Sequence, residues 1–355
     1  MTEAWIGSKT ASLDAAVAAA AKLLAASRLP VIAGLGTDVA GARAAIALAQ
    51  RIGGIVDHMH SDALLRDLDV MRETGMMLTT PNEARLRADF VLLAGPGLFE
   101  AWPEHAARPR LADKRAVWLC PGRDAKGTLT DHNIASIGKD PAQLPVMLAA
   151  LRARCAGRPV GTHPSMEQID ALAAELAKAR FGVAIWSAAA LDTLSVEMLC
   201  GLVKDLNETT RFSGLPLAPS DNAAAVLQVS GWTTGFPLRV AFARGAPEHD
   251  PWRFDAGRLV DSGEADCAIW ISAYRAHEPA WQRHVPTITV GAEPEHVSSD
   301  VAIVTGRPGA DHDSVAYWPA TGTLSAVRAS APTNATSVAN VLIRIAAALP
   351  PARSC

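Results

Sequence analysis

Residues 30–36 of the chain read PVIAGLG, an apolar run that ends in a glycine-containing turn. Residues 39–52, VAGARAAIALAQRI, follow with the apolar spacing of a helix, and GIVD at 54–57 is a second short apolar run. A strand, a helix and a second strand in this order predict a parallel βαβ unit, whose strands are buried on both faces. HMHSDALL, residues 58–65, comes directly after the unit.

Short apolar strands alternate with helices along most of the chain, which is typical of parallel sheets covered by helices on both faces. Residues 211–257 interrupt this pattern, being rich in Gly, Pro and Asn, and the polar stretch that includes Met76 and Met77 is expected to be a loop or a broken helix. We therefore predict an α/β protein with two doubly wound parallel-sheet domains. One domain would comprise residues 1–60 plus 225–355 and the other residues 61–224. Beyond the βαβ unit, the predicted helices are Leu13–Ser27, Ala142–Arg152, Met166–Ala179, Leu194–Asn207 and Val338–Leu349, and the predicted strands are Asp89–Gly95, Ala116–Cys120, Gly182–Trp186, Asp266–Ile271, Pro286–Val290 and Asp300–Val304.

The composition excludes several classes of protein. The 355 residues are 49% hydrophobic and 19% charged, and 33 basic residues against 36 acidic ones give a net charge of -3, which does not favour nucleic acid or an anionic membrane. No apolar run approaches the roughly 18 residues of a membrane span, and the N-terminus lacks the pattern of an export signal. We therefore expect a cytoplasmic protein.

Five cysteines occur, an odd number without any CxxC pair. Disulfide frameworks, zinc sites and iron–sulfur clusters need paired or clustered thiols. We therefore expect Cys120, Cys155, Cys200, Cys267 and Cys355 to be chemically inert.

The βαβ unit also resembles half of a nicotinamide site. Gly34 and Gly36 form a G-x-G turn, and Asp57 ends the next strand where a ribose-binding acid would stand. Val39 occupies the place of the third glycine, so a plain tight turn is the favoured interpretation. An NAD(P)-dependent oxidoreductase that uses Gly34, Gly36 and Asp57 remains the alternative function.

Two clusters contain residue types that bind divalent metals. The first is Asp57 with His58 and His60, and the second is Asp311-His312-Asp313. No further ligand is evident near the first cluster, and the second stands in a loop flanked by Gly and Pro, so we predict no metal site at either. The nucleophile elbow, the P-loop and the H-E-x-x-H motif are also absent.

Several segments, in order, resemble the B subunit of formylmethanofuran dehydrogenase, which belongs to the superfamily of molybdenum- or tungsten-bispterin oxidoreductases. They are the Leu13–Ser27 and Pro30–Gly34 segments, Gly54–Asp57 with Ser61, Ala88-Asp89 with its strand, Pro103-Glu104-His105, Gly231–Pro237 (GWTTGFP), and Val240–Pro247. The resemblance implies a molybdopterin-oxidoreductase-like fold, similar to the domains of formate dehydrogenase and DMSO reductase.

This sequence departs from that family where the family binds its redox groups. The family's iron–sulfur domain precedes the point at which this sequence starts. At the place of its metal-binding Cys and the following His, this chain has Ala63 and Leu64. Alanine cannot ligate a metal, so the resemblance implies no bound cofactor, no metal and no redox catalysis.

With these departures the chain resembles one branch of the family, the B subunits of the bacterial formyltransferase/hydrolase complex of methylotrophs. That complex converts formyl-tetrahydromethanopterin to formate through methylofuran in one-carbon metabolism. The resemblance implies a non-catalytic subunit without catalytic residues, whose partners are an amidohydrolase-like A subunit, a C subunit and a formyltransferase D subunit. A vestigial pterin cleft that contacts part of methylofuran is the third possibility, with His58, His60, Ala63, His105 and Trp232 as candidate residues.

Overall fold

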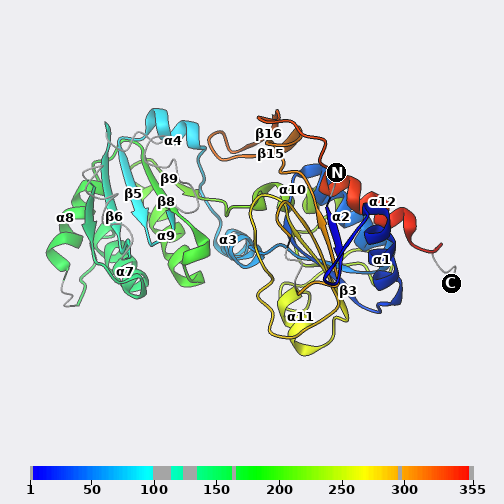
Figure 1. Ribbon diagram of the computed structural model, residues 1–355. Coiled ribbons are helices and arrows are strands. Elements are labelled where there is room, and N and C mark those ends of the chain that lie inside the picture. Colours follow the sequence, from blue (N-terminus) through cyan, green and yellow to red (C-terminus); the bar gives the residue numbers. More distant parts are fainter. Residues whose placement is uncertain (1–2, 99–112, 123–133, 162–164, 295–297, 352–355) are drawn as a thin grey trace. The chain divides into compact units, whose positions relative to one another are not determined.

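The computed structural model describes residues 3–98, 113–122, 134–161, 165–294 and 298–351. The chain divides into two compact units (Figure 1). The first unit consists of residues Met1–Ser61, Asp221–Tyr317 and Leu324–Cys355, and the second of Asp62–Ser220 and Trp318–Thr323. The residues that the structure describes include no helix long and apolar enough to cross a membrane.

The first unit is built on a nine-stranded sheet, counted within the described residues, in the order β11-β10-β4-β3-β12-β13-β14-β1-β2. The five strands from β4 to β14 are parallel, while the outer strands pair antiparallel. The strands are β1 (Ala4–Ile6), β2 (Lys9–Ala11), β3 (Pro30–Gly36), β4 (Ile55–Val56), β10 (Val240–Ala241), β11 (Glu248–His249), β12 (Cys267–Ser272), β13 (Thr287–Gly291) and β14 (Val301–Val304). A separate hairpin consists of β15 (Ser314–Trp318) and β16 (Thr323–Val327).

Helices cover both faces of this sheet. The helices α1 (Leu13–Ala26), α2 (Val39–Ile52), α10 (Ala223–Thr234) and α12 (Val338–Ala348) pack against one another, whereas α11 (Ala256–Ser262) shares an apolar cluster with β3 and β12. The predicted βαβ unit is confirmed as β3, α2 and β4. Asp38 caps α2 by accepting the amide of Gly41 at 2.8 Å, and Gly53 ends it in the left-handed conformation.

The second unit has a five-stranded parallel sheet, again within the described residues, in the order β7-β6-β5-β8-β9. Apolar clusters lie on both of its faces. The strands are β5 (Phe90–Ala94), β6 (Arg115–Leu119), β7 (Ala135–Ile137), β8 (Gly182–Trp186) and β9 (Phe212–Pro216), and the helices are α3 (Ser61–Thr74), α4 (Pro81–Arg87), α7 (Leu144–Cys155), α8 (Met166–Leu176) and α9 (Thr193–Leu206). Short 3₁₀ turns occur at Pro141–Gln143 and Ala188–Ala190.

The structure corrects three expectations. The sequence pattern predicts parallel sheets, and antiparallel strands, which it does not predict, extend both edges of the first sheet. Residues 211–257 are not irregular, since they contain β9, α10, β10, β11 and the start of α11. Helix α3 is absent from the predicted elements because its surface is charged, although Leu64, Leu65 and Leu68 have helical spacing.

Candidate functional site

The parallel sheet of the first unit has a switch point between β3 and β12. The chain leaves β3 toward β4 on one side, whereas β12 leads to β13 and then β14 on the other side. In open α/β sheets, ligands bind outside the carboxyl ends of the strands where the connections diverge in this way. This switch point is therefore the candidate site.

A buried carboxylate, Asp221, lies at this position, with its side chain 1% exposed. The guanidinium of Arg275 donates from Nη2 to Oδ2 of Asp221 at 2.9 Å. The Nε2 atoms of His60 and His277 lie 3.3 and 3.4 Å from the same oxygen. Three basic side chains thus converge on one carboxylate, and a buried charge of this kind is stable when it is so paired.

The backbone that carries Asp221 is held in a conformation that side chains disfavour. Asp221 and Asn222 have φ values of +57° and +62°, and such residues persist where their surroundings fix them. The amide group of Asn222 supplies this support, because Nδ2 donates to the Thr37 carbonyl at 2.8 Å and Oδ1 accepts the Tyr317 amide at 2.8 Å. Asp221 is therefore a fixed part of the site.

His58 is buried beside Asp221 and is neutral. Its Nδ1 accepts the main-chain amide of His60 at 3.0 Å, so the proton sits on Nε2, which donates to the Asp221 carbonyl at 3.3 Å. Burial first, and then the nearby His60 ring, lowers the pKa of His58 to about 3. A neutral ring with both nitrogens hydrogen-bonded is a structural group and offers no free lone pair to a metal.

The two glycines at the end of β3 are closely packed by their neighbours. A Cβ on Gly36 would meet the Met59 methyl group at 3.2 Å and Cβ of Asp221 at 3.6 Å. A Cβ on Gly34 would lie 2.6 Å from the Ile271 carbonyl oxygen. Both glycines are thus explained by close packing in this fold.

Asp57 also has a structural role. Its carboxylate accepts the Ser61 hydroxyl at 2.5 Å and the amide of Ala256, at the start of α11, at 3.0 Å. Nε of Arg239 lies 3.4 Å from the same group, and Asp57 is only 5% exposed. Burial raises the pKa of Asp57 to about 6, although Arg239 opposes the shift. Both carboxylate oxygens are therefore hydrogen-bonded inside the unit.

Two of the remaining predicted cleft residues belong to different units. Ala63 is 5% exposed on α3 and belongs to an apolar cluster of the second unit, with Val70 and Phe90. Trp232 is 55% exposed near the end of α10. His105 lies outside the described residues. The structure joins His58 to His60, whose ring centroids are 5.5 Å apart.

The loop at 311–313 directs its side chains to separate partners. The Asp311 carboxylate accepts the Arg307 amide at 2.7 Å, that of Asp313 accepts the Ala329 amide at 2.8 Å, and His312 Nδ1 donates to the Asp313 carbonyl at 2.9 Å. Within the described ranges, no group of three or more His, Cys, Asp or Glu side chains is arranged to hold a metal.

Sequence reasoning missed Asp221, Arg275 and His277. Together with His60 these residues form the polar cluster at the switch point. They lie in loops without a recognised motif. One signal was available in Asp221-Asn222, because both residue types tolerate the left-handed conformation and favour helix starts.

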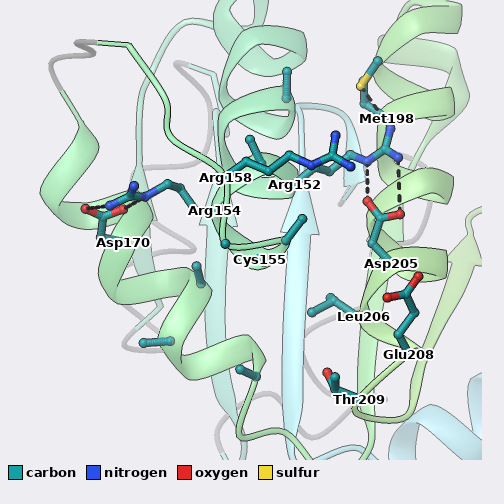
Figure 2. A pocket seen from close by; sticks show the side chains of 17 residues that line it. Arg152, Arg154, Cys155, Arg158, Asp170, Met198, Asp205, Leu206, Glu208 and Thr209 are labelled. Atoms are coloured by element: carbon teal, nitrogen blue, oxygen red, sulfur yellow. Dashed lines mark hydrogen bonds and ion pairs between the residues drawn. The ribbon is translucent and has the colours of Figure 1, made fainter.

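A hollow of about 990 Å³ lies in the second unit among the carboxyl ends of α7, α8 and α9 (Figure 2). Four of its charged side chains pair with one another, since Arg152 binds Asp205 at 2.8 Å and Arg154 binds Asp170 at 2.5 Å. Helices α8 and α9 each precede the next strand, so their carboxyl ends lie at the amino edge of the parallel sheet. Ligands of α/β sheets bind at the opposite edge, and we do not take this hollow as the functional site.

Comparison with known proteins identifies the family of the chain. No protein-family model matches the chain. The chain is 37% identical over 356 residues to the B subunit of the formyltransferase/hydrolase complex Fhc of Methylorubrum extorquens, covering 96% of each sequence. The chain belongs to the family of these B subunits. It also matches the crystal structure of the formyltransferase/hydrolase complex FhcABCD from Methylorubrum extorquens with methylofuran, with a TM-score of 0.86, 34% identity and coverage of 96% of this chain and 97% of that one.

The family is also related to redox enzymes. The B subunit of the tungsten-containing formylmethanofuran dehydrogenase 2 of Methanocaldococcus jannaschii is 26% identical over 290 residues, which are 75% of this chain and 65% of that protein. The corresponding protein of Methanococcus maripaludis is 24% identical over 337 residues, covering 87% of this chain and 77% of that protein. The resemblance expected from the sequence is thereby confirmed.

Proposed function

We propose that this chain is the B subunit of a formyltransferase/hydrolase complex and that it acts there as a non-catalytic structural subunit. The proposal rests on near full-length similarity to such a protein, both in sequence and in a solved complex. The residues of the chain itself support the loss of the metal–pterin site.

The non-catalytic role is supported by the residues of this chain that stand where the redox family binds its cofactor. Ala63, at the place where the redox family has its metal-binding Cys, is buried among apolar side chains, and its methyl group has no lone pair. At the switch point, Met59 and Asp221 occupy the space in front of Gly36. These residues do not fit a metal–pterin group.

In this proposal the chemistry belongs to the partner subunits. Formyl transfer from formyl-tetrahydromethanopterin to methylofuran would occur in the D subunit, and hydrolysis to formate in the amidohydrolase-like A subunit. The chain would keep the two-unit framework of a molybdopterin-oxidoreductase-like ancestor as a surface on which A, C and D assemble. No described residue is assigned to a methylofuran contact.

The test is to express the complex with and without this chain. We expect the chain to co-purify with its partners, the complex to contain no stoichiometric molybdenum or tungsten, and formyl transfer and hydrolysis to fall when assembly fails. Molybdenum or tungsten at one atom per chain would overturn the non-catalytic role. Failure of the chain to co-purify with any partner would overturn its place in the complex.

A further inference from the structure

The chain crosses between its two units at a few defined points. It leaves the first unit after Ser61 and returns at Asp221, and the hairpin tip Trp318–Thr323, which is entered after Tyr317, groups with the second unit. Units that are joined by few segments move relative to one another by default. The contacts that Ser61, Asp221 and Tyr317 make inside the first unit therefore decide where such movement begins.

The first crossing is tied to the second. His58 Nε2 donates to the main-chain oxygen of Asp221 at 3.3 Å, and His60 Nε2 lies 3.3 Å from Asp221 Oδ2. Ser61 closes the turn that carries both histidines, since its amide donates to the His58 carbonyl at 2.9 Å and its hydroxyl accepts the His58 amide at 3.1 Å. The last residues before the first crossing are thus bonded to the residue at which the chain returns.

The hairpin is tied to the same place through Asn222, the next residue of the chain. Oδ1 of Asn222 accepts the Tyr317 amide at 2.8 Å. Nδ2 of the same side chain donates to the carbonyl of Thr37, which directly follows β3, at 2.8 Å. One amide group therefore joins the hairpin, just before its tip, to the carboxyl end of β3.

The Asp221 carboxylate is also anchored to β12. Arg275 Nη2 donates to Asp221 Oδ2 at 2.9 Å, and Ser272 Oγ, at the end of β12, donates to the Arg275 carbonyl. His277 Nε2 lies 3.4 Å from the same carboxylate oxygen, and the Trp270 indole donates to the His277 carbonyl at 2.6 Å. The carboxylate is thus connected to the sheet through two side chains of the segment that follows β12.

The backbone at this point supports the same interpretation. Asp221 and Asn222 have φ values of +57° and +62°, directly before the start of α10. Residues persist in such a conformation only where the surrounding structure fixes it, and they mark switches and hinges as well as active sites. Here the fixing bonds come from the crossings and from the ends of β3 and β12.

We propose that Asp221 and Asn222 form a hinge clamp. The clamp holds the crossings at Ser61, Asp221 and Tyr317 as one rigid group on the carboxyl edge of the first sheet. Movement of one unit relative to the other is thereby confined to the few residues beyond the clamp. This inference goes beyond the proposed function, because it concerns a conformational property of the chain itself.

The test measures the distance between one nitroxide label on each unit by pulsed electron paramagnetic resonance. The labels are attached to the full-length chain through Val146→Cys on α7 and Ile343→Cys on α12, whose native side chains are 59% and 58% exposed. Cys355→Ser removes the terminal thiol from all samples. The width of the distance distribution reports how far the two units move.

Asp221→Asn is the main variant. Asparagine tolerates the left-handed conformation, but it lacks the charge that attracts Arg275 and His60. We expect the distance distribution to widen at least about twofold relative to the labelled chain with Asp221. Asp266→Asn is the matched control, because Asp266 accepts two main-chain amides at the amino ends of β3 and β12, at the opposite edge of the sheet from the clamp. This control should leave the width unchanged.

His60→Ala is a second variant that releases the first crossing alone. The His60 side chain is 29% exposed, so we expect this variant to fold and to widen the distribution less than Asp221→Asn does. His284→Ala, at an exposed histidine of the same unit, is its control and should have no effect.

An unchanged width in folded Asp221→Asn would overturn the clamp, and so would equal widening by Asp266→Asn. A chain with Asp221 whose distribution is already as wide as those of the variants would also overturn it. If Asp221→Asn does not fold, the decision falls to His60→Ala, and an unchanged width there would overturn the inference. Each of these outcomes leaves the proposed function intact, because co-purification with partner subunits tests that function separately.

Discussion

His58 Nε2 lies 3.3 Å from the main-chain oxygen of Asp221, while its Nδ1 accepts the His60 amide. A second proton would have to enter on Nδ1, where it would face the hydrogen of that amide. Burial and the His60 ring already lower the pKa of His58 to about 3, against 6.5 for an ordinary histidine. The unfolded chain therefore binds a proton at this residue between pH 6.5 and 3, whereas the folded chain does not.

The first prediction concerns acid stability. Because the unfolded state binds more protons in this window, His58 should lower the free energy of unfolding as the pH falls below 6.5, by up to about 1.4 kcal/mol for each pH unit. Asp57, whose pKa is raised to about 6, adds a slope of opposite sign between pH 3.8 and 6. Urea unfolding of wild type and His58→Asn between pH 4.5 and 7.5 isolates the histidine, since Asp57 is common to both.

The control for this measurement is His284→Asn, because His284 is exposed. The difference in unfolding free energy between wild type and His58→Asn should shift in favour of the variant as the pH falls. The His284→Asn variant measures the effect of the same substitution at an exposed position. Parallel profiles for wild type and His58→Asn would show that His58 does not titrate as a buried neutral ring.

The second prediction concerns Asp57 and distinguishes a structural role of its carboxylate from a role in binding a nicotinamide cofactor. Asp57→Ala removes one carboxylate from Arg239, whose side chain is 10% exposed, and leaves the Ala256 amide without its acceptor. Because Asp255 remains as a partner of Arg239, we expect a loss of about 2–3 kcal/mol in the free energy of unfolding. Denaturant unfolding measures this loss.

Asp14→Ala is the matched control for Asp57→Ala. Asp14 pairs with Arg344, but its side chain is 83% exposed, so this variant should lose less than about 1 kcal/mol. Titration of wild type with NAD(P) at millimolar concentration completes the test. Measurable affinity that Asp57→Ala removes without loss of stability would restore the oxidoreductase alternative.

The parts of the fold that the sequence predicted are those set by local pattern. The βαβ unit follows from the buried run at 30–36, the cap at Asp38 and the left-handed Gly53, all of which act over a few residues. The polar cluster could not be predicted in the same way. Asp221 and Arg275 are 54 residues apart, and they meet because the parallel sheet places their loops at one edge.

Helix α10 shows why the sequence of residues 211–257 does not predict regular structure. Its sequence is apolar on nearly all sides, so it lacks the one-sided pattern of a surface helix, and glycines stand within it and at its end. Packing against α2 and β3 stabilises it instead. The candidate residue Trp232 was recognised from its motif, but its exposed position depends on this packing and could not be read from the motif.

The third prediction separates the two glycines of the G-x-G turn. Gly34 has φ +77°, and a Cβ there would lie 2.6 Å from the Ile271 carbonyl oxygen, which is main chain and cannot move aside. On Gly36 a Cβ would meet the end of Met59 at 3.2 Å, and this side chain is flexible. We expect Gly34→Ala to lower the free energy of unfolding by about 2 kcal/mol or more, and Gly36→Ala by clearly less. Denaturant unfolding of both variants checks the order, and equal losses would contradict it.

The fourth prediction concerns the thiols. Burial raises the pKa of Cys120 and Cys155 to about 11, and that of Cys200 and Cys267 to about 12. Because the thiolate is the reactive species, a pKa of 11 leaves roughly one thiol in a thousand reactive at pH 8. A Cys355→Ser variant confines any labelling to these four residues. Its native form should resist Ellman's reagent at pH 8, and its urea-unfolded form should release four equivalents of thionitrobenzoate. Labelling of the native variant within minutes, located by peptide mass spectrometry, would identify a reactive cysteine that this packing does not explain.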